Sequence, residues 1–130
     1  MMAITLAACE IETPSNGDLD GLWHLETVDT LTTGGRANLS DCRVFWAVQA
    51  RLLNVSSENE SYYLKFLHKG GMLTVRDAYE DFRQSNDSTY EFLKPYGISA
   101  LPDTFSVRQL NSNRMVIEKA EGIRLSFTKF

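Results

Sequence analysis

The sequence has 130 residues, of which 43% are hydrophobic and 23% are charged, and its formal net charge is −4. This length and composition are typical of one globular domain that can bury a hydrophobic core without disulfides or metal ions. The acidic balance and the lack of a basic cluster argue against a nucleic-acid partner, and no apolar run of about 18 residues predicts a membrane-spanning helix.

The chain begins with a short apolar segment that ends in Leu6-Ala7-Ala8-Cys9. This segment resembles the lipobox of bacterial lipoproteins, in which the chain is cut before the cysteine and the cysteine is acylated. The resemblance implies that Cys9 is the lipid-attachment site. It also implies that the protein is anchored to a bacterial membrane in the cell envelope, facing the periplasm or the surface. The alternatives are a chance apolar N-terminus, or a frayed strand with a buried Cys9.

The segment that follows Cys9 is rich in polar, small and acidic residues, which is typical of a flexible tether. We therefore assign residues 1–20 to the lipoprotein signal and tether, and residues 21–130 to the folded domain. Within that domain, the first strand is expected at 22–28 and a loop over 33–38. Residues 43–55 are expected to form one long strand, because apolar side chains alternate along it. The inward set would be Val44, Trp46, Val48, Ala50 and Leu52.

The clearest hairpin signal is Gly70-Gly71, because glycine readily adopts the positive φ that a tight turn needs. It would join strands at 62–68 and 72–75. A further strand is expected near 78–82, and a short helical turn at 89–94, ended by Pro95. The last strands are predicted at 105–110, 115–119 and 123–130. Seven or eight short strands with short connections indicate an all-β sandwich or barrel.

The first strand of the domain begins with Gly21-Leu22-Trp23, which is similar to the Gly-x-Trp motif of the lipocalin superfamily. The strand pattern and the lipobox together resemble lipocalin-like domains of small bacterial lipoproteins of uncharacterised function. The resemblance covers residues 21–130 and implies an antiparallel up-and-down β-barrel of about eight strands. It places Trp23 at the closed end, Gly21 in close backbone packing there, and a basic residue of the last strand across the indole. Arg124 is the expected residue, and Lys129 is the second choice.

The inward-facing side chains of such a barrel either fill it or line a cavity for one small ligand. If a ligand binds, we expect it to contact Trp46, Tyr62, Phe66 and His68 near one end, although His68 is also consistent with a solvated strand end. The sequence thus predicts a membrane-tethered lipocalin-like module that binds a small apolar or amphipathic ligand. The alternative is a non-catalytic interaction or structural lipoprotein, with a filled barrel that contacts another envelope protein.

Enzymatic motifs are missing from the sequence: there is no Gly-x-Ser-x-Gly, no His-Glu-x-x-His and no phosphate-binding glycine loop. We therefore expect no catalytic activity and no cofactor. We also expect no metal site, because Cys42, His24 and His68 are isolated in the sequence. Cys42 is interpreted as a small buried residue, or as the partner of an unacylated Cys9 in a disulfide.

Overall fold

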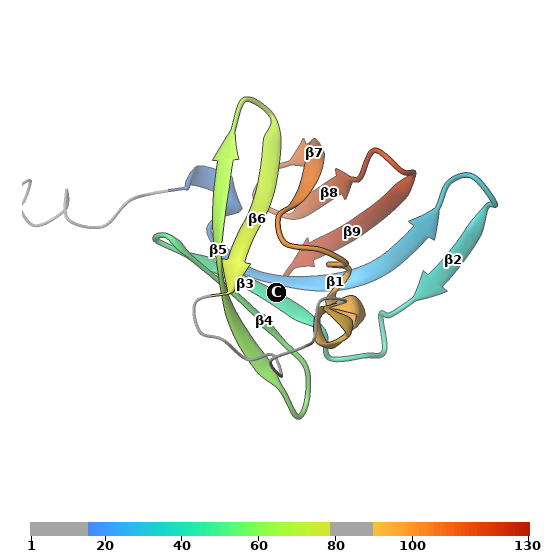
Figure 1. Ribbon diagram of the computed structural model, residues 1–130, viewed down its shortest axis with the longest axis horizontal. Helices are drawn as coiled ribbons and strands as arrows, with labels where there is room; N and C mark the ends of the chain where they lie inside the picture. The colour runs from blue at the N-terminus through green and yellow to red at the C-terminus, as the bar shows by residue number, and fades with distance from the viewer. Residues whose placement is uncertain (1–15, 79–89) are drawn as a thin grey trace, which may run out of the picture.

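Residues 16–78 and 90–130 are described by the computed structural model, in which an antiparallel sheet closes on itself (Figure 1). The closure is made by β1 and β9, which pair along most of their length. Eight strands, β1 and β3 to β9, form the barrel, and β2 is an additional strand on the edge of β1. The strands are β1 (Gly21–Thr30), β2 (Gly35–Asn38), β3 (Phe45–Gln49), β4 (Leu52–Ser56), β5 (Ser61–Lys69), β6 (Met72–Ala78), β7 (Asp103–Leu110), β8 (Arg114–Glu118) and β9 (Ile123–Lys129). The predicted all-β, up-and-down barrel of about eight strands is confirmed.

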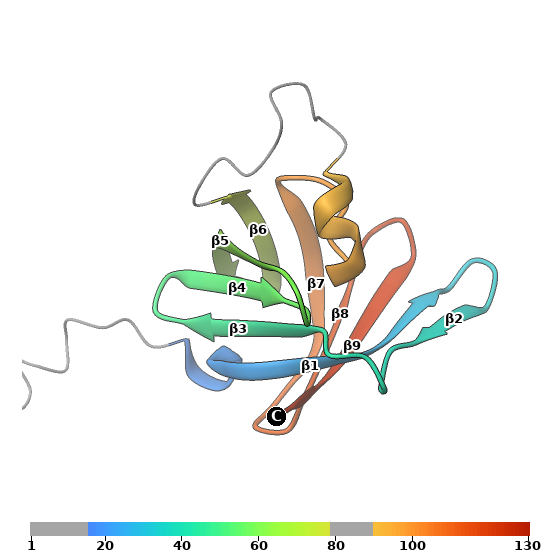
Figure 2. The same ribbon diagram turned by 90° about the horizontal axis from the view of Figure 1, so that it is seen from below.

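Strand β2 lies in the segment that was expected to be a loop, so that expectation is wrong. The first residues of β1 pair with β3, but β1 continues past Phe45, where β3 begins, so its second half has no β3 partner. β2 pairs with this half, from Thr27 opposite Asn38 to Thr30 opposite Gly35. Pairing an open edge satisfies its backbone hydrogen-bonding groups. The β1–β2 hairpin therefore extends outward from the barrel (Figures 1 and 2).

The prediction of one long strand over 43–55 is also wrong, because a tight turn divides it into β3 and β4. The turn begins at Ala50, whose φ is 55°, a left-handed conformation that glycine usually occupies. Because Ala50 and Arg51 occupy this turn, with no glycine or asparagine, the sequence does not indicate a turn there. Beyond it the alternation changes phase, so Leu53 and Val55 are buried in place of Ala50 and Leu52.

The remaining predicted elements correspond closely to the structure. The β5–β6 hairpin turns at Gly70 and Gly71, whose φ values are 61° and 76°, both positive as expected. β7, β8 and β9 match the last three predicted strands. The helical turn is the 3₁₀ helix η2 (Glu91–Tyr96), which contains Pro95 instead of ending before it. The strand expected near 78–82 is described only at Ala78, where β6 ends; residues 79–89 lie outside the described part.

The antiparallel order gives the barrel two ends that differ in what covers them. The first, called the η1 end, holds the start of β1, the β3–β4, β5–β6 and β7–β8 turns, and the end of β9. The 3₁₀ helix η1 (Gly17–Leu19) lies there. The opposite end, called the η2 end, holds the β4–β5 and β8–β9 turns and the helix η2.

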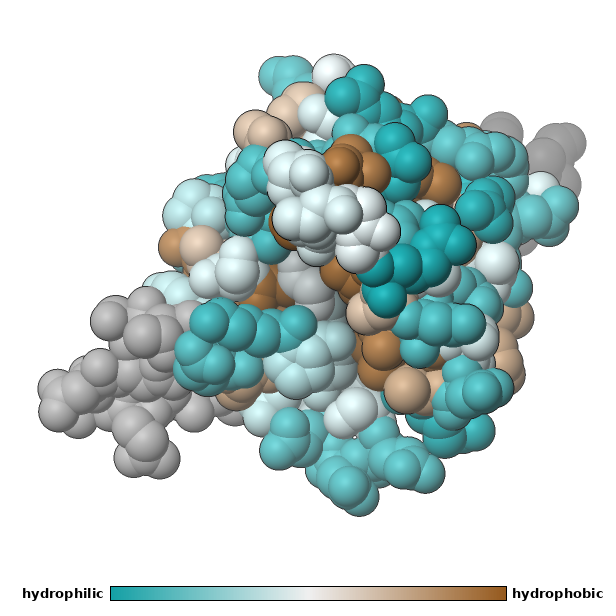
Figure 3. Space-filling view, turned by 90° about the vertical axis from the view of Figure 1, so that its right-hand side faces the viewer, coloured by the Kyte–Doolittle hydropathy of each residue, from teal (hydrophilic) through white to brown (hydrophobic). Residues whose placement is uncertain are grey.

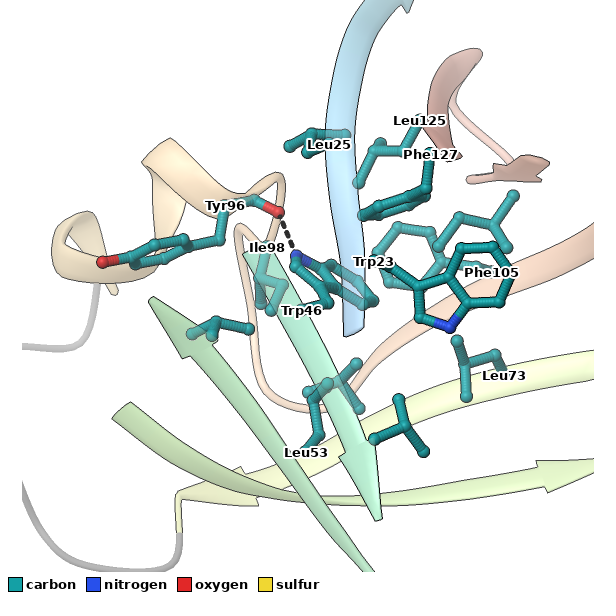
Figure 4. Close-up of a cluster of buried hydrophobic side chains, with 14 of the residues drawn as sticks. Trp23, Leu25, Trp46, Leu53, Leu73, Tyr96, Ile98, Phe105, Leu125 and Phe127 are labelled. Carbon is teal, nitrogen blue, oxygen red and sulfur yellow. Dashed lines mark hydrogen bonds between the residues drawn. The ribbon is translucent and has the colours of Figure 1, made fainter. Parts of the chain in front are cut away.

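The middle of the barrel is filled by large apolar side chains from each of its eight strands. Trp23 and Trp46 lie opposite each other on neighbouring strands and are fully buried. The Trp46 ring contacts those of Phe105 and Phe127, with centroid separations of 6.0 and 5.0 Å. Figure 4 shows these rings together with Leu25, Leu53, Leu73 and Leu125 in one cluster.

The packed chain begins before the boundary expected at residues 20 and 21. Leu19 in η1 is 1% exposed and belongs to the hydrophobic core. Asn16 donates a hydrogen bond from Nδ2 to the carbonyl oxygen of Ala50, at 2.8 Å, and another to the Asp20 carboxylate. Residues 16–20 are thus held against the barrel, whereas Cys9 lies outside the described residues.

Candidate functional site

The η1 end is closed by Trp23 and by a lysine from the last strand. The Trp23 indole N–H donates to the carbonyl oxygen of Leu19 at 2.8 Å. The ammonium group of Lys129 lies 4.5 Å from the centre of the Trp23 ring and donates to the carbonyl oxygen of Asp20 at 2.7 Å. A Cβ at Gly21 would meet the Lys129 side chain at 3.0 Å, and φ at this glycine is 131°. Gly21 therefore leaves room for the cation that covers the indole.

The cation against Trp23 is thus Lys129, which corrects the expectation that Arg124 would lie there. Arg124 pairs in register with Asp29, far along β1 from Trp23, and its guanidinium group contacts the Glu118 carboxylate at 2.6 Å. The hydrogen bond from Arg124, assisted by Arg108, lowers the pKa of Glu118. Arg124 belongs to the outer wall, because β9 places it on the face opposite the buried Leu125.

The η2 end is covered by aromatic side chains. The Trp46 indole donates to the carbonyl oxygen of Tyr96 at 3.0 Å, as the dashed line in Figure 4 shows. The Tyr62 ring packs edge-on against Phe92 and Tyr96, with centroids 5.0 and 6.2 Å away. Burial raises the pKa of Tyr96, and the Tyr62 pKa is raised mainly for the same reason. These phenols therefore remain neutral near pH 7.

The four residues expected to contact a ligand together are divided between the two ends. Trp46 and Tyr62 belong to the η2 end, whereas Phe66 and His68 lie toward the β5–β6 turn at the η1 end. His68 lies six positions after Tyr62 along β5, a distance of about 20 Å. Because Trp46 is also fully buried and hydrogen-bonded, the structure does not bring the four into one site.

Phe66 and His68 line a pocket of about 540 Å³ at the η1 end, which we call the open-edge pocket. It forms because β4 begins at Leu52, opposite Lys65, so β5 has no β4 partner beyond that point. One wall comes from the segment before β1 and from the β3–β4 turn, and the other from β5 and β6. The lining residues are Asn16, Ala50, Arg51, Lys65, Phe66, Leu67, His68 and Arg76.

The open-edge pocket combines apolar surface with positive charge. Phe66 is half-buried and packs on the core, and Leu67 is 50% exposed. Arg51, Lys65 and Arg76 supply cations, and none of the described residues that line the pocket carries a carboxylate. The volume lies within the range usual for small-molecule sites. The sequence gives no signal that Arg51 and Arg76 belong together, because they lie 25 positions apart and share no motif.

Two other pockets have volumes of about 420 Å³ each, and both are lined by acidic and basic side chains together. Neither therefore presents one sign of charge to a ligand. One contains Cys42, which is exposed and therefore not the buried residue that was expected. The other lies at the β1–β2 hairpin beside the ion pair of Arg36 with Asp29. Figure 3 shows the side that carries this hairpin, where hydrophilic residues predominate and apolar ones appear in recesses.

Within residues 16–78 and 90–130, no three His, Cys, Asp or Glu side chains are grouped so that they could hold a metal ion. Nor does any helix there have the length and apolar character needed to cross a membrane.

A closed eight-stranded antiparallel barrel whose first strand carries a Gly-x-Trp motif at a capped end defines the lipocalin-like class of β-barrels. The model of the family described as "Lipocalin-like domain" matches residues 4–130. The chain belongs to this family, whose barrels typically bind small hydrophobic ligands and are generally not enzymes. None of the curated proteins matches the chain.

Solved structures show the same fold. A lipocalin-like protein from Bacteroides uniformis ATCC 8492 is 23% identical, with a TM-score of 0.68 over 88% of this chain and 100% of its own. An uncharacterised protein from Bacteroides eggerthii DSM 20697 is 17% identical, with a TM-score of 0.68 over 85% of this chain and 98% of its own. A protein from Burkholderia xenovorans is 15% identical, with a TM-score of 0.60 over 95% of this chain and 87% of its own.

Proposed function

We propose that this protein is a non-catalytic, membrane-tethered lipocalin-like module that binds a small apolar or amphipathic ligand. The open-edge pocket carries the proposal, because its 540 Å³ combine the apolar Phe66 and Leu67 with polar groups. Small-molecule sites are usually concave and largely apolar, with a few polar groups that orient the ligand. Ligand binding is also what the lipocalin-like fold typically does.

Native mass spectrometry of the protein purified from its own host tests ligand binding. We expect a carried-over small molecule on the wild type, and a reduced fraction of it on Leu67→Ser. Leu31→Ser is the matched control, because Leu31 is similarly exposed, at 43% against 50%, but lies outside the pocket. A ligand that stays bound equally to both variants would place binding elsewhere, and a wild type with no bound molecule would count against the proposal.

The tether is proposed from the lipobox-like segment that ends in Cys9. Asn16, the first described residue, lines the open-edge pocket and lies seven positions after Cys9 in the sequence. Two or more acyl chains on one cysteine would give stable membrane anchoring, which a single chain does not. The protein would then reside in the cell envelope.

Metabolic labelling with a fatty-acid probe tests the tether. The wild type is expected to be labelled and recovered with membranes, and Cys9→Ala to be unlabelled and released. Cys42→Ala serves as the control, since Cys42 is the other cysteine and is exposed. Labelling that persists in Cys9→Ala, or an unlabelled wild type, would contradict acylation at Cys9.

The second candidate function is a structural lipoprotein that contacts another envelope protein. Exposed apolar side chains on the outer wall favour it: Leu22 is 36% exposed and Phe130 is 77% exposed. Phe130 packs edge-on against Phe45, with centroids 5.2 Å apart, so the two phenylalanine rings form one surface. A cross-link to an envelope protein that is lost in Phe130→Ser, without any carried-over ligand, would favour this function over ligand binding.

A further inference from the structure

Arg51 and Arg76 line the open-edge pocket and have no carboxylate partner among the described residues. Among residues 16–78 and 90–130, no hydrogen bond or ion pair engages the guanidinium groups of Arg51 and Arg76. Arg36, Arg108 and Arg124, by contrast, each pair with an aspartate or a glutamate. The chain as a whole is acidic, with a net charge of −4, so a pocket whose described lining holds cations and no carboxylate departs from the average surface.

The cationic side chains of the pocket lie around the end of β5, which also carries the apolar Phe66 and Leu67. Side chains alternate along β5, so Lys65 and Leu67 point to one face of the strand and Phe66 and His68 point to the other. The pocket reaches both faces because β4 does not continue beside this part of β5. An elongated apolar chain can therefore lie along Phe66 and Leu67 while a charged group meets the arginines.

We propose that the open-edge pocket binds an anionic amphiphile, with its carboxylate or phosphate head on Arg51 and Arg76 and its apolar chain against Phe66 and Leu67. This inference rests on the proposed ligand-binding function and specifies the ligand's charge. Guanidinium groups suit such heads, because their N–H donors match the geometry of carboxylate and phosphate oxygens. His68 adds a further hydrogen-bonding group at the same end.

The position of the pocket on the chain indicates where such an amphiphile would come from. Asn16 lines the pocket and lies seven positions after the proposed anchor at Cys9. A fully extended chain of that length spans at most about 25 Å. A lipid-anchored protein would thus keep the open-edge pocket close to the membrane surface. Anionic phospholipids of the membrane and free fatty-acid anions both have the required chemistry.

Binding is measured by calorimetry on the full chain with decanoate and with 1-decanol, a neutral amphiphile of equal chain length. We expect decanoate to bind more tightly and to weaken as ionic strength rises. Arg51→Gln with Arg76→Gln should raise the decanoate Kd about tenfold, as loss of two exposed charge contacts implies. The matched control combines Arg43→Gln with Arg114→Gln, which removes the same charge outside this pocket and should leave the Kd unchanged.

A vesicle arm distinguishes the two sources, using the full chain with Cys9→Ser so that no anchor contributes. The ligand is a membrane phospholipid if the protein is recruited to vesicles of phosphatidylcholine with phosphatidylglycerol but not to vesicles of phosphatidylcholine alone. In that case the Arg51/Arg76 variant should not be recruited to either. Decanoate binding without recruitment identifies a free monoacyl anion.

Three results would count against the proposal. Equal affinity for decanoate and 1-decanol would overturn the anionic preference and leave the ligand-binding function intact. An equal loss in the Arg43/Arg114 control would show that general charge, and not the pocket, attracts the anion. Failure of both amphiphiles to bind, with no vesicle recruitment, would overturn the proposed function as well.

Discussion

Replacing Trp23 with alanine is expected to lower the free energy of unfolding by about 3–5 kcal/mol, the usual range for deleting a large core aromatic. Trp23 is fully buried, and its indole N–H is bonded to the carbonyl oxygen of Leu19. The variant loses the core packing and leaves that carbonyl without its donor. Denaturant unfolding followed by circular dichroism measures the change. A loss below about 1 kcal/mol, as for an ordinary surface substitution, would contradict the role of Trp23 in closing the η1 end.

The same variant tests which cation covers the indole. Lys129 lies over the Trp23 ring, and a desolvated contact of this kind is worth about 2 kcal/mol. Trp23→Ala and Lys129→Met should therefore be non-additive in a double-mutant cycle. Trp23→Ala and Arg124→Gln should be additive within about 0.3–0.5 kcal/mol, because Arg124 binds Glu118 instead. Coupling to Arg124 and not to Lys129 would reverse this assignment.

Replacing Lys119 with methionine is expected to cost about 3–5 kcal/mol, because it leaves a buried carboxylate without its counter-ion. The Lys119 ammonium lies 3.0 Å from the Asp103 carboxylate, and the two side chains are 5% and 10% exposed. The lysine also donates to the Ser99 hydroxyl at 2.9 Å. Through these two contacts, Lys119 connects the segment between η2 and β7 to the β8–β9 turn. Thermal and denaturant unfolding of the variant measure the loss.

Two controls separate loss of the ion pair from loss of packing at this site. Lys94→Met removes an exposed pair with Glu91 and should cost no more than about 1 kcal/mol. Adding Asp103→Asn to Lys119→Met should restore part of the lost stability, since the unpaired charge is gone while Ser99 keeps an acceptor for its backbone N–H. A double variant no more stable than Lys119→Met alone would show that the buried charge is not what destabilises it.

The sequence by itself determined the features that depend on neighbouring residues. Alternation of apolar side chains located β1 and β5 to β9 within a few residues, because each strand buries one face. Gly70-Gly71 located a hairpin, because that turn needs positive φ at both positions. The Gly-x-Trp motif at Gly21 and Trp23 indicated the lipocalin-like barrel, and the fold agrees. These are local constraints, and a single chain displays them directly.

Only the tertiary structure decided how distant segments meet. The β3–β4 turn at Ala50 was hidden because sheet pairing imposes a left-handed conformation on a residue that does not favour it. The choice of Lys129 over Arg124 depended on the register of β9 against β1. The open-edge pocket joins Arg51 to Arg76 because β4 starts opposite Lys65 and does not cover the end of β5. Barrel closure sets these registers through contacts between strands far apart in the chain, so alternation and turn residues alone could not specify them.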